Sequence, residues 1–196
     1  QEEGGGDVPL LWGGGEGEIN EPIRDSYVSR VRWLIANLLT ATLASTIISV
    51  FEGAIQNMVA LAVLMPIVAG LGGNAGTQTL AVTVPALATN QLVATHAWRA
   101  VRREIAIALL NGSTVAVVIG IAGTILFANP LLGGVISAAM LANIVIAGLA
   151  GVFVPLTLSR LKIDPAIASS IFVTMTTDSM GFLVFLGLAT VSGLVG

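Results

Sequence analysis

The chain has 196 residues, of which 55% are hydrophobic and only 10% are charged, and it contains no cysteine. Soluble domains are typically about 25% charged, so the composition excludes a water-soluble fold, and the lack of cysteine excludes disulfides and thiolate metal sites. The formal net charge of −3 says little about partners, because the positions of the charges matter more than their sum. We therefore expect an all-α polytopic protein whose main solvent is the lipid bilayer.

The first 27 residues differ from the rest of the chain. Residues 1–25 are rich in glycine and hold seven of the eleven acidic residues. This composition is typical of a flexible linker or tail, and it lacks the basic start and short apolar run of a cleavable signal peptide. We predict a tail over residues 1–27 and a transmembrane domain over residues 28–196.

Five segments of the transmembrane domain have the roughly 20 mostly apolar residues that a membrane-spanning helix needs. They cover residues 33–51, 55–87, 105–127, 131–158 and 165–195. The second, fourth and fifth exceed one bilayer thickness, so we expect tilted, kinked or broken helices there. The second in particular is expected to be interrupted.

The positive charges fall on one side of these five crossings. All eight Lys and Arg, and the single His, lie before the first segment, between the second and third, or between the fourth and fifth. Residues 51–58 and 127–134, which form the other two loops, contain no Lys or Arg. Because cytoplasmic loops are enriched in Lys and Arg, the pattern predicts a multi-pass plasma-membrane protein with its N-terminus in the cytoplasm and its C-terminus outside.

Asp178 is the strongest candidate functional residue. It lies well inside the fifth segment, 14 residues beyond Asp164, which corresponds to roughly 20 Å along a helix. No Lys or Arg occurs in the interior of a predicted span to neutralise it. A carboxylate at this depth is costly and indicates a functional site. The alternative is a protonated Asp178 that is hydrogen-bonded to neighbouring Thr hydroxyls.

The second candidate is the glycine-rich stretch of residues 66–79 in the second segment. Glycines permit unwinding, and non-helical backbone at membrane depth is tolerated where it lines a cavity. Freed carbonyls, together with the side chains of Asn74, Thr77 and Gln78, would then offer oxygen atoms to a hydrated cation. The alternative is that the glycines serve close helix packing.

Oxygen donors without cysteine suit a hard ion such as Mg²⁺ or Ca²⁺. Glu52, at the outer end of the first segment, either collects cations or is simply solvated. Asp164 precedes Pro165, a pattern that favours helix N-capping, although a role at an inner ion site stays open. Asn143 is expected to form an interhelical hydrogen bond. The Gly-x-x-Gly pairs at residues 120–123 and 148–151 are expected to be close-packing faces.

These residues resemble the transmembrane domain of the MgtE magnesium channel and transporter family, over about residues 28–196. The matching stretches are Phe51-Glu52, the Gly-Gly-Asn-x-Gly-x-Gln pattern within residues 66–78, Asp164-Pro165-Ala166, and Thr177-Asp178-x-x-Gly181. The resemblance implies a homodimer of ten transmembrane helices, with a pore on the two-fold axis lined by the second and fifth spans. It implies no nucleic-acid partner.

In this resemblance Asp178 matches the central acid of the pore, which holds hydrated Mg²⁺. Asn74 and the backbone around Gly70 and Thr174 match positions near that ion, and Asp164 matches a cytoplasmic acid associated with gating ions. The resulting candidate metal-site residues are Asp178, Asn74, Gly70, Gly73, Thr77, Thr174, Gly181, Asp164 and Glu52. Bacterial members usually also carry cytoplasmic regulatory domains that sense Mg²⁺, and we expect none in this chain.

The sequence therefore predicts a dimeric channel that conducts Mg²⁺ into the cytoplasm. Motifs for hydrolysis or ATP binding are missing from the sequence, so we expect no enzymatic activity and a transport that is passive or ion-coupled. The main alternative is a secondary transporter that exchanges Mg²⁺ or another cation against Na⁺ or H⁺. A metal-dependent membrane enzyme and a purely structural subunit are weaker alternatives. The sequence leaves the preference among Mg²⁺, Mn²⁺, Co²⁺ and Ca²⁺ open.

Overall fold

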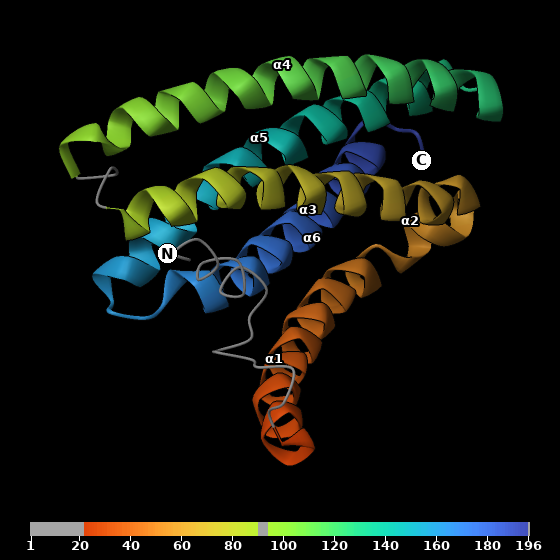
Figure 1. Ribbon diagram of the computed structural model, residues 1–196. Helices are drawn as coiled ribbons and strands as arrows, with labels where there is room; N and C mark the ends of the chain where they lie inside the picture. Colours follow the sequence, from red (N-terminus) through yellow and green to blue (C-terminus); the bar gives the residue numbers. More distant parts are fainter. Residues whose placement is uncertain (1–21, 90–93, 196) are drawn as a thin grey trace.

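The computed structural model describes residues 22–89 and 94–195, and within these ranges every regular element is a helix. In chain order the helices are α1 (Ile23–Val50), α2 (Glu52–Asn57), α3 (Val59–Ala88), α4 (Ala94–Phe127), α5 (Pro130–Arg160) and α6 (Pro165–Val191) (Figure 1). Five of them, all except the short α2, are long and apolar enough to cross a membrane. The predicted all-α class is therefore confirmed for the described residues, as are five helices long and apolar enough to be the predicted spans. Residues 1–21 of the predicted tail lie outside the described residues.

The predicted interruption of the second span at the glycine-rich stretch is wrong. Helix α3 runs without a break through residues 66–79. The predicted segment of residues 55–87 is instead divided at Met58, whose extended backbone (φ −142°, ψ 92°) separates α2 from α3. Two of the glycines in this stretch, Gly72 and Gly76, are instead positions of close packing, as described below.

The helix α4 starts earlier than expected. It begins at Ala94 rather than near residue 105, so His96, Arg99, Arg102 and Arg103 lie on its first turns and not in a loop. Arg and Ala, which make up much of residues 94–104, are good helix formers, so the helix continues through this charged stretch. The basic charge of this region is therefore presented on a helix.

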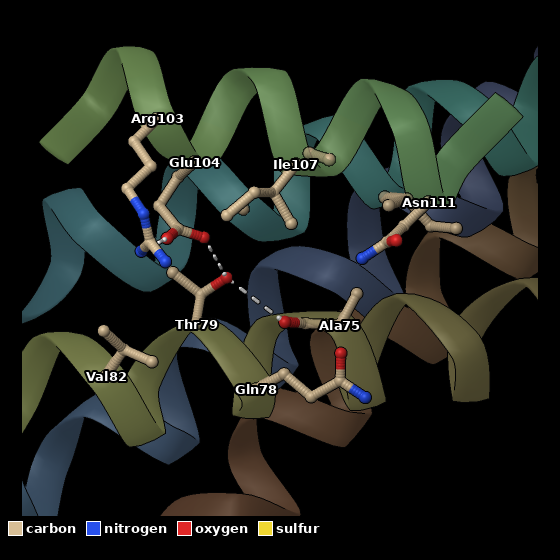
Figure 2. A pocket seen from close by; sticks show the side chains of 11 residues that line it. Ala75, Gln78, Thr79, Val82, Arg103, Glu104, Ile107 and Asn111 are labelled. Atoms are coloured by element: carbon tan, nitrogen blue, oxygen red, sulfur yellow. Dashed lines mark hydrogen bonds and ion pairs between the residues drawn. The ribbon is translucent and has the colours of Figure 1, made fainter.

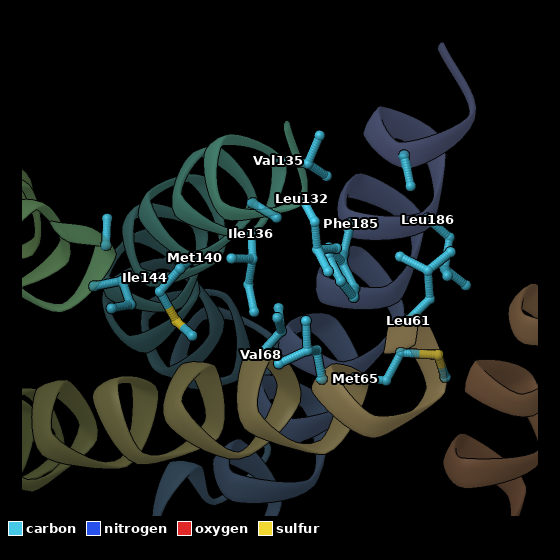
Figure 3. Close-up of a cluster of buried hydrophobic side chains, with 14 of the residues drawn as sticks. Leu61, Met65, Val68, Leu132, Val135, Ile136, Met140, Ile144, Phe185 and Leu186 are labelled. Atoms are coloured by element: carbon cyan, nitrogen blue, oxygen red, sulfur yellow. The ribbon is translucent and has the colours of Figure 1, made fainter. Parts of the chain in front are cut away.

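Helix α5 is the centre of the packing. It lies against α3, α4 and α6, while α3 also packs along α6. The core between α3, α5 and α6 contains wholly buried side chains from each helix, including Leu61, Ile136 and Phe185 (Figure 3). This core fixes the relation between α3 and α6, which carry most of the candidate site residues in their middle turns.

Helix α1 lies apart from this core. It projects away from the other helices (Figure 1), and its main contacts with them are to α6. Large apolar side chains along it are open, among them Leu38 and Leu39 at 65% and 68% exposure. In a bilayer such a surface is covered by lipid or by another polypeptide, because it has no partner within the described part of this protomer.

Candidate ion-binding site

Asp178 is the central residue of α6, with 13 helical residues on either side of it. Its side chain is half-buried, and no described residue donates a hydrogen bond to it or forms an ion pair with it. The neighbouring hydroxyls bond elsewhere: Thr177 donates to the Thr174 carbonyl at 3.1 Å, and Thr176 donates to the Phe172 carbonyl at 2.8 Å. The alternative of an Asp178 carboxyl satisfied by adjacent threonines thus finds no support in these contacts.

Helix α3 brings its glycine-rich stretch alongside Asp178. A Cβ built on Gly73 would lie 3.9 Å from the Thr177 hydroxyl, so the two helices meet one residue before Asn74 on α3 and one residue before Asp178 on α6. The side chain of Asn74 is exposed and has no partner in the described ranges. The oxygen-bearing side chains of Asp178 on α6 and Asn74 on α3 are thus free of other bonds and could bind an ion or its water.

The backbone of α3 differs from the expectation. The stretch is helical, so the expected carbonyls freed by a break are not present there. The Gly73 carbonyl accepts a hydrogen bond from the Thr77 hydroxyl at 2.9 Å, and a Cβ on Gly70 would meet nothing within 4 Å. Contact of an ion with Gly70, Gly73, Thr77 or Thr174 stays a prediction. On α3 the Asn74 side chain is a free polar group next to Gly73, where α3 meets α6.

A buried amide on α5 sets how closely α3 and α6 approach each other. Asn143 is wholly buried, and its Nδ2 donates to the Val68 carbonyl at 2.9 Å, which confirms the expected interhelical hydrogen bond. A Cβ on Gly181 would lie 2.7 Å from this Nδ2, and a Cβ on Gly72 would overlap the same atom. A side chain at either position would therefore force the Asn143 amide to shift. The Asn143 Oδ1 is left without a partner in the described structure.

Other glycines also serve packing, as expected for the Gly-x-x-Gly pairs. A Cβ on Gly76 would lie 2.5 Å from Val173 Cγ1 on α6. A Cβ on Gly151 would lie 2.6 Å from Thr79 Cβ on α3, and one on Gly148 would lie 3.1 Å from Ala108 Cβ on α4. Close packing is thus the correct interpretation for Gly72 and Gly76, whereas Gly70 and Gly73 are not explained by it.

A cavity of about 190 Å³ lies between α3 and α6 on the side toward the start of α6. Its polar lining consists of the hydroxyl residues Thr77, Ser169 and Ser170, and the rest is apolar. Ser169 is buried, and its Oγ has no hydrogen-bond partner among the described residues. In sequence Ser169 lies between Asp164 and Asp178, so hydroxyl-lined space exists beside α6 between these two acids.

Asp164 begins α6 as predicted. It is the N-cap residue, with Pro165 in the first turn, and its Oδ1 accepts a hydrogen bond from the Ala166 N–H at 2.9 Å. The predicted cap is confirmed, while a role for Asp164 toward gating ions stays a prediction.

Replacing Asp164 by Ala is expected to destabilise the protein by about 1 kcal/mol, because the Ala166 N–H loses its side-chain acceptor. Replacement by Ser should retain most of the stability, since Ser is an equally good cap. Thermal unfolding in mild detergent would measure both variants. Equal stability of the Ala variant and the unmodified chain would contradict a capping role.

Glu52 lies at the other end of the bundle. It opens the short α2 and accepts a hydrogen bond from the Gln56 amide at 3.1 Å, and Asn57 of the same helix donates to the Val195 carbonyl just beyond α6 at 3.3 Å. The structure therefore places Glu52 near the C-terminal end of α6 and Asp164 at its N-terminal end. Nowhere in residues 22–89 and 94–195 do three His, Asp or Glu side chains gather into a group that could hold a metal. Within the candidate site on α3 and α6, the carboxylate is that of Asp178.

The sequence interpretation missed Glu104, a buried acid on α4 with 8% exposure. It directly precedes the predicted third span, within the charged stretch between the second and third spans. An acid beside three arginines at a membrane boundary is typically a solvated group. The signal that could have singled it out is that it directly adjoins an apolar run of more than 20 residues.

The comparisons with known proteins show the family to which the chain is related. The profile of a family described as "MgtE: Divalent cation transporter" matches residues 65–188. The chain is 37% identical over 161 residues to the magnesium transporter MgtE of Bacillus subtilis, covering 82% of this chain and 36% of that protein. It is 33% identical to proteins of the same name from Thermus thermophilus and Enterococcus faecalis, over 83% and 88% of this chain. The chain spans little more than a third of the length of these relatives.

Proposed function

The chain belongs to the MgtE family of divalent cation transporters, and from this premise we propose that two copies of it form a channel that conducts Mg²⁺ across the membrane. The observation that carries the proposal is Asp178, an acid in the middle of a membrane-spanning helix with no partner in the described chain. An intramembrane carboxylate of this kind marks an ion pathway. The relatives named magnesium transporters supply the choice of Mg²⁺.

A second copy of the chain completes the site in this proposal. One carboxylate per protomer is a weak site for a divalent ion, whereas a two-fold axis beside α3 and α6 places two Asp178 side chains opposite each other. Closed symmetric dimers are the commonest homo-oligomers. The exposed α1 gives additional apolar surface for such a dimer, and ten helices would then surround the axis.

The bound ion would keep its water. Mg²⁺ loses water reluctantly and usually binds to proteins through few direct ligands. In the proposed site the Asp178 carboxylates and the Asn74 side chain accept hydrogen bonds from the water shell. Continuous helical backbone around Asn74 fits this arrangement, because a hydrated ion needs acceptors at some distance and does not need freed carbonyls around it.

The membrane potential drives uptake in this proposal. A potential of 100 mV contributes about 2.3 kcal/mol per charge, so a divalent ion gains about twice that when it enters an inside-negative cell. Ions would arrive at the side of the Lys- and Arg-free loops, pass Asp178, and continue past the hydroxyl-lined cavity toward Asp164. At the basic cytoplasmic face Asp164 would partly offset the repulsion by the arginines.

Uptake of Mg²⁺ into liposomes that contain the protein is expected without any Na⁺ or H⁺ gradient. An inside-negative K⁺ diffusion potential should raise the initial rate several-fold, because the ion carries two charges. A Mg²⁺-sensitive dye inside the liposomes measures the rate, and protein-free liposomes provide the control.

A rate that depends on an imposed Na⁺ or H⁺ gradient and ignores the potential would instead identify a coupled exchanger. Broken helices are typical of coupled transporters. Because α3 is unbroken, this feature does not favour the exchanger. An absence of Mg²⁺ flux under both conditions would reject Mg²⁺ transport altogether.

A further inference from the structure

The buried Glu104 lies beside a cavity of about 120 Å³ that is lined by residues of α3, α4 and α5 and by none of α6. The polar residues that line this cavity are Gln78, Thr79, Arg103, Glu104 and Asn111. In Figure 2 the Glu104 side chain extends from α4 toward Thr79 on α3, and the Arg103 guanidinium lies next to its carboxylate. The proposed conduction mechanism makes no use of this acid.

Both oxygens of the Glu104 carboxylate are bonded, but by very different groups. The Thr79 hydroxyl donates to Oε2 at 3.1 Å. The Arg103 Nη1 contacts Oε1 at 3.2 Å, through a single nitrogen of a side chain that is 62% exposed. A one-point ion pair with an exposed Arg contributes little, whereas the hydrogen bond from Thr79 is buried and joins two helices. We therefore take the hydrogen bond from Thr79, and not the ion pair with Arg103, as the contact through which Glu104 acts on the packing.

The Thr79 hydroxyl has one proton and two possible acceptors. It lies 3.3 Å from the Ala75 carbonyl on its own helix and 3.1 Å from Glu104 Oε2. Bonds to charged acceptors are the stronger ones, so the proton is drawn to α4. On its other side Thr79 packs directly against Gly151 of α5, where there is no room for a Cβ atom. Thr79 is thus held from two sides, five residues along α3 from Asn74.

This bond stands out because α3 and α4 otherwise contact each other very little. Helix α4 packs along α5, and α3 packs along α5 and α6. Among the described side chains, the Thr79–Glu104 pair is the hydrogen bond that directly joins α3 to α4. A displacement of the basic start of α4 would therefore reach the helix of Asn74 either indirectly, through α5, or directly, through this pair.

We propose that Glu104 is a positioning residue that fixes the cytoplasmic half of α3 through Thr79 and so keeps the pore conductive. The proposal rests on the channel function proposed above. Glu104 lies off the proposed conduction path, and it would affect how many ions pass per second without contacting them. The half-saturating Mg²⁺ concentration, which Asp178 would determine, would stay unchanged.

The test compares four single variants of the full chain in the liposome assay. Glu104→Leu and Thr79→Val remove the bond while approximately keeping side-chain volume, and each is expected to lower the maximal uptake per folded protein three- to tenfold. Glu104→Gln and Thr79→Ser keep an acceptor and a donor, and each should retain at least half of the uptake. Both single variants remove the same hydrogen bond. The double variant Glu104→Leu, Thr79→Val should therefore match the more impaired single variant in uptake and in melting temperature, with no additional loss.

The outcomes separate this proposal from the channel function. Wild-type uptake with unchanged uptake in Glu104→Leu would overturn the positioning role and leave the channel intact. Loss of folded protein with normal uptake per folded molecule, or a changed half-saturating concentration, would also overturn it. An inactive wild type would reject the channel. Additive losses of melting temperature in the double variant would reject the Thr79–Glu104 link irrespective of transport.

Discussion

Replacing Asp178 by Asn is expected to reduce Mg²⁺ uptake into liposomes about a hundredfold. A hydrogen bond to a charged acceptor contributes about 1.5 kcal/mol or more, and in a dimer two carboxylates are lost, which together corresponds to about two orders of magnitude in ion binding. The amide has a similar shape, so the fold should persist. Initial rates of dye-reported uptake at several Mg²⁺ concentrations measure the effect, and Asp178→Glu should retain part of the activity because it keeps the charge.

The matched control is Asp25→Asn, which removes one acidic charge in the first turn of α1, far from the middle of α6. It should leave uptake unchanged, and both variants should have the melting temperature of the unmodified chain within a few degrees. An Asp178→Asn variant that conducts Mg²⁺ with unchanged rate and unchanged preference over monovalent ions would contradict the proposed site.

The five long helices were predictable because they depend on local properties of the chain, whereas the short α2 was not expected. An apolar run of about 20 residues in lipid has to be a helix, since every backbone polar group must be bonded internally. The N-cap at Asp164 was predictable for the same reason: the Asp-Pro pair acts within the first turn of its own helix. Asp178 was identifiable because a lone acid in an apolar run is conspicuous without any knowledge of its neighbours.

The interpretation of the glycines in α3 was not predictable, since it depends on residues distant in sequence. A glycine can unwind a helix or admit a neighbour, and composition does not distinguish these roles. Asn143, 75 residues from Val68 in the chain, decides the matter for Gly72. Glu104 was missed for a related reason, because its burial arises from Thr79 and α5 rather than from its own charged surroundings.

Replacing Gly72 by Ala is expected to destabilise the protein by about 2 kcal/mol, because the new methyl group would overlap the Asn143 amide and overpacking of a filled core costs about 1–3 kcal/mol. Thermal or denaturant unfolding in detergent measures the loss. Gly187→Ala is the matched control on α6, where a Cβ meets nothing within 4 Å. There the same substitution should raise stability by about 0.5–1 kcal/mol through helix propensity.

The decisive variant combines Gly72→Ala with Asn143→Ala. Asn143→Ala alone removes the bond to the Val68 carbonyl and leaves a void, so it should also be destabilising. In the double variant the methyl group introduced by Gly72→Ala fills part of that void, and the loss should be smaller than the sum of the single losses by about 1–3 kcal/mol. Asn143→Leu, which keeps the bulk and removes only the amide, should not rescue Gly72→Ala. Additive losses, or an equal rescue by Leu, would mean that the Asn143 amide does not set the spacing of α3 and α6 at Asp178.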